Sequence, residues 1–565
     1  MGNSLLFRAL VVCVAVLVAT QLAASPAGEE SGADSGGIVE VTGGFGNWKW
    51  NDYPDNPVSQ YIQDTLGVKY VRDGWRSGDE KAVRLAAGDL PDMFIIEAFE
   101  RAPLQEAGYI LPLNDLIEQY GPNIKKTAAL ALPFVAENWA DENGLFYGLP
   151  GELMVNDPVI FGQYPSLQLC FRWDLYKAIG TPKLTTIDDI VAAAAEMVRL
   201  NPQTDEGLRV YGVGGRVANL WGLTIPMSAW YGYQNTETWG IVLDNRTTDP
   251  VENYYDTDSP MWRMAEFYYK QNQAGILDPD TLIARERSEL AAKMAKGQYV
   301  GMTIRAGGFA NGWDAIHAKD GRGLVAVPIE GGGIWGGQDL RFGSANFRTI
   351  AASAQDKIEA VMRLFDWGFS EHGMRTLSTG VEGVHWDFVD GKGRVRPETL
   401  ELRAARGEAW SATGIDMLGW GANTQGFMHS DGQPIQLYNT DEAVSQLLNA
   451  TDLDYAAYYG VTNPEGHWNN YMNAGTIATA ANLDYRVIYN MPLMSDELRR
   501  IDSEINTLVE RRVPLLVLAT SDAEFRAGRD RLIEDIRKAG YDQIRDWYVS
   551  NYNRLKAEMG PKPPL

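Results

Sequence analysis

Apolar strand-like segments alternate with helix-like segments from residue 37 onward, and this alternation restricts the fold more than any other feature. The strand-like segments are 37–44, 68–71 and 93–96, and the helix-like segments are 57–65, 80–87 and 113–120. The pattern predicts an α/β protein with a mostly parallel sheet and helices on both faces. Because ligands bind outside the carboxyl ends of the strands in such sheets, we expect the loops after residue 43 and after Ile96 at the mouth of a site.

A second α/β stretch begins near Leu167. It contains helix-like segments at 187–200, 261–274 and 288–295 and a strand-like segment at 299–304. Thr185 or Thr186 is the expected N-cap of the first of these helices. The tail, 502–556, is almost wholly helix-like, with Gly540 as a C-cap between two helices. At 565 residues, two domains are the natural expectation.

The N-terminus has the layout of a secretory signal peptide. Arg8 precedes an apolar run from Ala9 to Ala19, and Ser25 and Ala27 suit a cleavage site. We therefore expect a signal peptide over 1–27, a flexible tether over 28–37, and an exported periplasmic or extracellular protein. The alternative is an uncleaved membrane anchor. A lipid on Cys13 is disfavoured because the bulky Val12 precedes it, and Cys170 is left as the sole cysteine of the mature chain.

Charge and aromatic content narrow the partners. The net charge of −24 and the pI near 4.7 argue against nucleic acid and anionic membranes, which need a basic surface. The chain has 17 Trp and 26 Tyr, and several of the Trp lie beside Gly, Asn or Pro in loop-like settings. Most aromatics are expected in the core, and those in loops could stack against a ligand.

The motifs of familiar enzymes are missing from the sequence. It contains no G-x-S-x-G, no H-E-x-x-H and no paired C-x-x-C. The five His are scattered, and acidic pairs are too common in so acidic a chain to indicate a glycosidase. The sequence therefore favours a binding protein over an enzyme.

A series of phrases resembles the extracellular solute-binding proteins of carbohydrate ABC importers, and among them the large oligosaccharide-binding subgroup that includes lipoprotein-type and alginate-binding proteins. Their order and spacing over about 38–556 carry the resemblance. The phrases are GDLPD (88–92), AGYILPLNDLI (107–117), LFYGLPG (145–151), FRWDLYKAIG (171–180), TTIDD (185–189), GILDPD (275–280), MAKG (294–297), VEGVHW (381–386) and DGK (390–392).

The resemblance implies a two-lobed periplasmic-binding-protein fold with hinge crossovers and a long helical C-terminal region. We expect 38–150 and 300–350 in the first lobe, and 151–299 and 351–565 in the second. The implied function is to enclose a carbohydrate between the lobes and deliver it to the transmembrane permease of an ABC importer, as a monomer. Two alternatives remain: a secreted polysaccharide-degrading enzyme, or a sugar binder that feeds a sensor.

Binding a sugar requires aromatic side chains for its C–H faces and polar side chains for its hydroxyls. The strongest candidates are Trp386, Glu382, Trp230 and Tyr147. Trp386 is flanked by glycines and a turn, so we expect it at a loop tip with Glu382 close by. For each candidate, packing in the core is the competing interpretation. The remaining candidates are Tyr231, Asn47, Trp48, Glu97, Glu152 and Arg305.

The sequence departs from some members of the subgroup at a calcium-binding loop. The matching stretch, 201–212, offers side-chain oxygens only from Asn201, Gln203, Asp205 and Glu206, with Arg209 nearby. Calcium sites need more closely spaced oxygens, so an ordinary surface turn without metal is expected. We expect no other cofactor, and the small number of obvious cleft bases favours a neutral sugar slightly over a uronic one.

Overall fold

The computed structural model describes residues 37–563 apart from 47, 76–77, 152–166, 237–239, 252–253, 258, 285–286, 306–310, 335–338, 340, 406 and 420–426. The side chains of 48, 78–79, 98–99, 287 and 344–345 are also outside the description.

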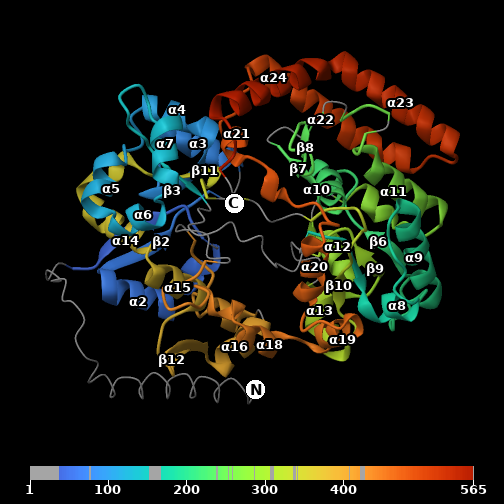
Figure 1. Ribbon diagram of the computed structural model, residues 1–565, viewed down its shortest axis with the longest axis horizontal. Coiled ribbons are helices and arrows are strands. Elements are labelled where there is room, and N and C mark those ends of the chain that lie inside the picture. The colour runs from blue at the N-terminus through green and yellow to red at the C-terminus, as the bar shows by residue number, and fades with distance from the viewer. Residues whose placement is uncertain are drawn as a thin grey trace. The chain divides into compact units, whose positions relative to one another are not determined.

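The first sheet has five strands in the order β2-β1-β3-β11-β4 (Figure 1). Strands β1, β2 and β3 are parallel, whereas β11 is antiparallel to both β3 and β4. The strands are β1 (Val39–Gly43), β2 (Val68–Arg72), β3 (Met93–Glu97), β4 (Leu149–Gly151) and β11 (Ser344–Ile350).

Helices from two distant parts of the chain build the core around this sheet. The buried residues of this core come from 41–149 and 347–443. Local signals set the helix ends: the Asn56 side chain accepts from the Ser59 N–H at the start of α2, and Gly67 ends that helix at a φ of 63°. The helices are α2 (Pro57–Leu66), α3 (Gly78–Ala87), α4 (Ala98–Glu106), α5 (Asn114–Tyr120), α6 (Pro122–Thr127), α7 (Ala131–Asn138), α14 (Ile358–Trp367), α15 (Glu371–Thr379), α16 (Pro397–Ala405), α17 (Glu408–Ser411) and α18 (Asp441–Leu447).

The second sheet has four strands in the order β10-β5-β9-β6. Strands β6 and β9 are parallel, and β5 is antiparallel to β9 and β10. Its strands and nearby helices are β5 (Cys170–Arg172), β6 (Tyr211–Gly214), β9 (Tyr299–Met302), β10 (Leu324–Ala326), α8 (Trp173–Ala178), α9 (Ile187–Leu200), α10 (Leu220–Tyr231), α11 (Trp262–Gln273), α12 (Arg287–Ala295), α13 (Asn311–His317), α19 (Ala450–Tyr459) and α20 (Pro464–Asn473).

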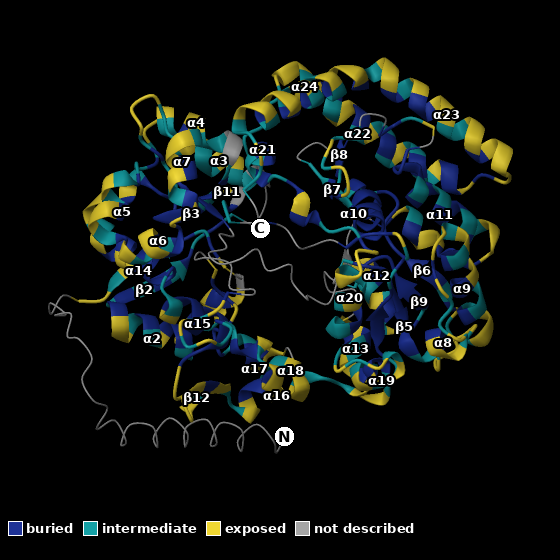
Figure 2. Ribbon diagram, in the orientation of Figure 1, coloured by how far each residue is buried: buried dark blue, intermediate teal, exposed yellow. Residues whose placement is uncertain are grey.

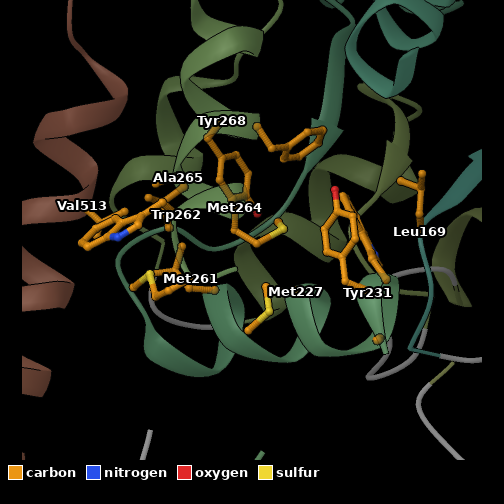
Figure 3. Packing of buried hydrophobic residues seen from close by; sticks show 14 of the residues in the cluster. Leu169, Met227, Tyr231, Met261, Trp262, Met264, Ala265, Tyr268 and Val513 are labelled. Atoms are coloured by element: carbon orange, nitrogen blue, oxygen red, sulfur yellow. The ribbon is translucent and has the colours of Figure 1, made fainter. Parts of the chain in front are cut away.

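Three long C-terminal helices complete the second core. Helix α22 packs against α11, and Val513 of α22 lies with Met261, Trp262 and Ala265 in the same cluster (Figure 3). The outer surfaces of α23 and α24 are largely exposed, while their inner positions are buried (Figure 2). This amphipathic pattern is what anchors a surface helix to a core. The three long helices are α22 (Asp496–Val517), α23 (Asp522–Ala539) and α24 (Tyr541–Met559), and the short helix α21 (Tyr485–Tyr489) precedes them.

Short elements join these layers. Two hairpins stand apart from the main sheets: β7 (Tyr233–Asn235) with β8 (Val242–Asp244), and β12 (Trp386–Val389) with β13 (Lys392–Val395). The 3-10 helices are η2 (Trp48–Asp52), η3 (Pro279–Leu282), η4 (Ala318–Asp320), η5 (Ala352–Lys357), η6 (Leu437–Asn439) and η7 (Ala480–Asn482).

The predicted α/β fold class is confirmed, and most predicted elements lie within one or two residues of the observed ones. The Thr186 side chain caps α9 by accepting from the Asp189 N–H, and Gly540 separates α23 from α24. In each sheet all strands but one run in the same direction, as expected of a mostly parallel sheet, but the reversed strand makes both sheets mixed. In the first sheet β11 lies between β3 and β4 and runs against both, and in the second sheet β5 runs against both of its neighbours.

In two stretches, strand pairing and packing differ from the expected lobe boundaries. Residues 300–302 of β9 and the whole of β10 fall within 300–350 but pair in the second sheet, and among the described strands of that range β11 alone joins the first. Buried residues of 360–443 pack in the first core, although we expected 351–565 in the second. Which sheet a strand joins depends on pairing between segments that are far apart in the chain, and the local sequence pattern does not reveal this pairing.

Within the described part of the chain, no helix combines the length and the apolar character needed to cross a membrane.

Candidate functional site

The loop that follows β1 is held rigidly at the carboxyl edge of the first sheet. A side chain on Gly43 would lie 2.3 Å from the Tyr70 ring, so only glycine fits there. The Tyr70 hydroxyl donates to the Phe45 carbonyl oxygen at 3.0 Å, and Arg72 Nε donates to the Gly46 carbonyl oxygen at 2.9 Å. These contacts give the edge a fixed backbone on which side chains can be positioned.

Glu97 is the last residue of β3 and lies at this same edge. It pairs across the sheet with Asn346 at the beginning of β11. When the Asn346 amide is oriented to satisfy both groups, its nitrogen donates to the two Glu97 carboxylate oxygens at 2.9 and 2.7 Å. The sheet register therefore fixes the position of the carboxylate.

Two charged side chains flank Glu97. Lys81 Nζ of α3 lies 2.6 Å from Glu100 Oε2, and the same oxygen accepts from the Glu97 N–H at 2.7 Å. Burial raises the pKa of Glu97, Lys81 opposes that rise, and the negative charge of Glu100 adds to it. We call the group of Trp75, Lys81, Glu97, Glu100 and Asn346 the Glu97 cluster.

Trp75 supplies an aromatic ring beside these polar groups. It is half-buried, its ring meets the Phe94 ring edge-on at 5.9 Å, and Lys81 Nζ lies 5.5 Å from the centre of the Trp75 ring. The Glu97 cluster thus combines carboxylate acceptors, an ammonium donor and part of an aromatic surface. That set of groups suits a ligand with hydroxyls and apolar C–H faces.

The structure buries Trp230 and Tyr231 in a helix. Both lie at the C-terminal end of α10. Trp230 has no exposed surface, and its Nε1 donates to the Thr303 carbonyl oxygen at 3.0 Å. Tyr231 is 8% exposed, lies in the buried cluster of Figure 3, and has the Arg263 guanidinium 4.5 Å from its ring centre. Burial raises the pKa of Tyr231 to about 12. This burial favours the competing interpretation, packing in the core, and a ligand contact of either residue stays a prediction.

The expectation that Trp386 stands at a loop tip is wrong. It begins β12, is 4% exposed, and its Nε1 donates to the Gly380 carbonyl oxygen at 2.8 Å. Gly380 and Gly383 have φ values of 99° and 76°, which let the chain wrap around the ring. Glu382 is exposed on this turn, and its backbone forms an isolated β-bridge with that of Trp386. The two residues are close together, as expected, but the indole faces inward.

Tyr147 and Arg305 make contacts within the protein. The half-buried Tyr147 donates its hydroxyl to Asp141 Oδ2 at 3.5 Å. Arg305 follows β9, as expected, and its guanidinium pairs with Asp314 at 2.8 Å while Nε donates to the Leu324 carbonyl oxygen at 3.0 Å. Whether either residue contacts a ligand stays a prediction.

Some predictions fall outside the described residues. These are Asn47, Glu152, the Trp48 side chain, the signal peptide 1–27 and residues 28–36 of the tether.

The stretch compared with a calcium loop forms a hydrogen-bonded surface turn. The Thr204 N–H donates to the Leu208 carbonyl oxygen at 2.8 Å, and Gly207 has a φ of 77°. Arg209 donates to the Gly275 carbonyl oxygen at 2.8 Å. Among the side chains that the structure describes, no three His, Cys, Asp or Glu residues gather as a metal site requires.

Sequence reasoning missed four members of the Glu97 cluster: Trp75, Lys81, Glu100 and Asn346. The rule that found Glu97, which looks for polar or aromatic residues just after a strand, would also have found Trp75, because it follows the predicted strand 68–71. Lys81 and Asn346 depend on helix placement and sheet register, which have no comparable local signal.

The family model of the bacterial extracellular solute-binding proteins matches residues 65–374. A search of the curated proteins finds no match.

Several solved structures share the fold over nearly the whole chain. The S. pneumoniae ABC-transporter substrate-binding protein FusA in complex with kestose has 14% identity and a TM-score of 0.63, with 93% of this chain and 100% of that chain covered. The alginate-binding protein AlgQ2 without calcium has 15% identity, a TM-score of 0.59, and coverage of 92% and 98%. The N-glycan transport solute-binding protein of Streptococcus pneumoniae has 14% identity, a TM-score of 0.55, and coverage of 93% and 100%.

Proposed function

Because the chain belongs to the family of bacterial extracellular solute-binding proteins, we propose that it binds a sugar or oligosaccharide between its two lobes and delivers it to the permease of an ABC importer. We further propose that it is exported, acts as a monomer and binds its ligand without catalysing a reaction. Three proteins of the same fold support a carbohydrate ligand, since their names refer to kestose, alginate and N-glycans.

The observation that carries this proposal is the Glu97 cluster at the carboxyl edge of the first sheet. Glu97 and Glu100 can accept hydrogen bonds from sugar hydroxyls, Lys81 can donate one, and the Trp75 ring can cover a C–H face. The two carboxylates are held by a strand end and by the first turn of α4, so they lose little conformational freedom when a ligand binds.

Replacing Glu97 by Gln tests the proposal directly. An oligosaccharide panel should first yield a ligand that raises the melting temperature of the wild-type protein. Glu97→Gln should then weaken binding of that ligand by about 1.5–3 kcal/mol, the worth of a hydrogen bond to a charged group, as measured by calorimetry. Glu106→Gln, at the exposed end of α4, is the matched control and should bind normally. A panel without any ligand, or equal losses in both variants, would contradict the proposal.

Trp75→Ala tests the aromatic part of the site. Loss of the ring should cost about 1–3 kcal/mol of binding, the range known for flat rings that stack on aromatic side chains. Because Trp75 is only half-buried, the free energy of unfolding should change less than it does for a fully buried Trp. Val83→Ala on the exposed surface of α3 serves as the control. Unchanged affinity in Trp75→Ala would remove Trp75 from the site.

A further inference from the structure

Glu97 also lines an open cavity of about 720 Å³. The Glu97 cluster is polar, whereas the walls of this cavity are mostly apolar. Its lining residues come from the end of β3, from α4, from α21, α22 and the segment that joins them, and from α24. Figure 1 shows where these elements lie. The volume is in the range of small-molecule sites. The lining residues are Glu97, Pro103, Ile488, Met491, Pro492, Leu493, Met494, Arg499, Trp547 and Tyr548.

Two charged side chains of this cavity are already engaged. Glu97 accepts from Asn346, and Arg499 pairs with Asp496 and donates to the Met494 carbonyl oxygen at 3.2 Å. The other polar side-chain groups of the lining are the Trp547 N–H and the Tyr548 hydroxyl, so a sugar ring placed here would bury most of its hydroxyls against apolar walls, which is unfavourable. An alkyl or aryl group would instead exchange water for Trp547 and the methionines, whose flexible side chains adapt to irregular shapes.

Glu97 connects the cavity to the proposed carbohydrate site, because the same residue belongs to both. A single ligand can therefore place a sugar on the Glu97 cluster and an attached apolar group in the cavity. Leu493 is one of the residues that line the cavity, and half of its surface is exposed.

We propose that this cavity is a subsite for the apolar group of a glycoside, so that the protein prefers sugars with an alkyl or aryl substituent to the free sugars. The inference rests on the proposed carbohydrate function and adds the class of ligand to it.

The test compares n-octyl and methyl β-D-glucopyranosides and the corresponding maltosides, below the micelle concentration, by calorimetry. The wild-type protein should bind the octyl compounds at least tenfold more tightly than the methyl compounds. Leu493→Glu should lose most of this preference, because it replaces an apolar lining residue of the cavity by a charged one. Leu515→Glu is the matched control on α22: it changes another exposed leucine, outside the cavity lining, and should keep the preference.

Two results would overturn the subsite: equal affinity of the wild-type protein for octyl and methyl compounds, including no binding of either, or an undiminished octyl preference in Leu493→Glu. The carbohydrate proposal fails separately. If the octyl preference depends on Leu493 but no panel carbohydrate binds, the cavity is apolar as inferred and the carbohydrate function is wrong. If a panel carbohydrate binds through Glu97 without an octyl preference, only the subsite is lost.

Discussion

Trp230→Ala should lower the free energy of unfolding by about 3–5 kcal/mol, the cost of truncating a fully buried tryptophan. The ring has no exposed surface and meets the Phe267 ring edge-on at 5.2 Å. Its indole N–H bonds the Thr303 carbonyl oxygen just after β9, so the variant also leaves a buried acceptor without that donor. Urea denaturation followed by circular dichroism measures the loss.

Trp75→Ala is the comparison that separates a core role from a ligand role. It removes the same side chain from a half-buried position, so its main effect should be on sugar affinity, whereas the main effect of Trp230→Ala should be on stability. If Trp230→Ala kept its stability within about 1 kcal/mol and lost ligand binding, Trp230 would be a ligand residue that this conformation covers.

The sequence predicted the helices and strands well because the signals that end them are local. Thr186 caps α9 through its own side chain, and Gly67 and Gly540 supply left-handed conformations at helix ends. Such contacts span a few residues, and the pattern of residue types reveals them.

The assignment of β9 and β10 could not be predicted in the same way. Strand β9 pairs with β5, more than a hundred residues earlier in the chain, and with β6. Any strand with a similar apolar pattern could have joined either sheet, so the choice depends on packing of the whole chain.

The candidate site shows the same division between local and distant information. Glu97 was found because it follows a buried strand, and the fold places it at the expected edge. Trp386 was misplaced because the glycines around it look like an exposed turn. Their positive φ values instead fold the chain back so that Gly380 accepts the indole N–H. Nearby glycines thus indicate a sharp turn, but they do not indicate which way the enclosed side chain points.

Charged groups connect residues 561–562, which follow α24, to two earlier parts of the chain. Asp339, in the connection from β10 to β11, is 2% exposed and pairs with Arg341 at 2.9 Å and with Lys562 at 3.1 Å. Lys562 also donates to the Ala481 carbonyl oxygen, and Arg486 donates to the Pro561 carbonyl oxygen at 3.1 Å. Burial alone would raise the pKa of Asp339, but Arg341 and Lys562 outweigh it and hold the pKa below its ordinary value.

Asp339→Asn should therefore lower the free energy of unfolding at neutral pH by about 3 kcal/mol, because it leaves two cations without their buried partner. A depressed pKa in the folded state stabilises the protein above the ordinary value of 3.8, and this stability is lost as the pH falls through the lower folded-state pKa. The difference between wild type and variant should accordingly shrink on acidification. Asp205→Asn, which alters a carboxylate that is 93% exposed and 3.8 Å from Arg322, is the matched control and should change stability by less than about 0.5 kcal/mol. Urea denaturation between neutral and acidic pH gives both measurements, and a pH-independent difference would show that Asp339 does not act through its charge.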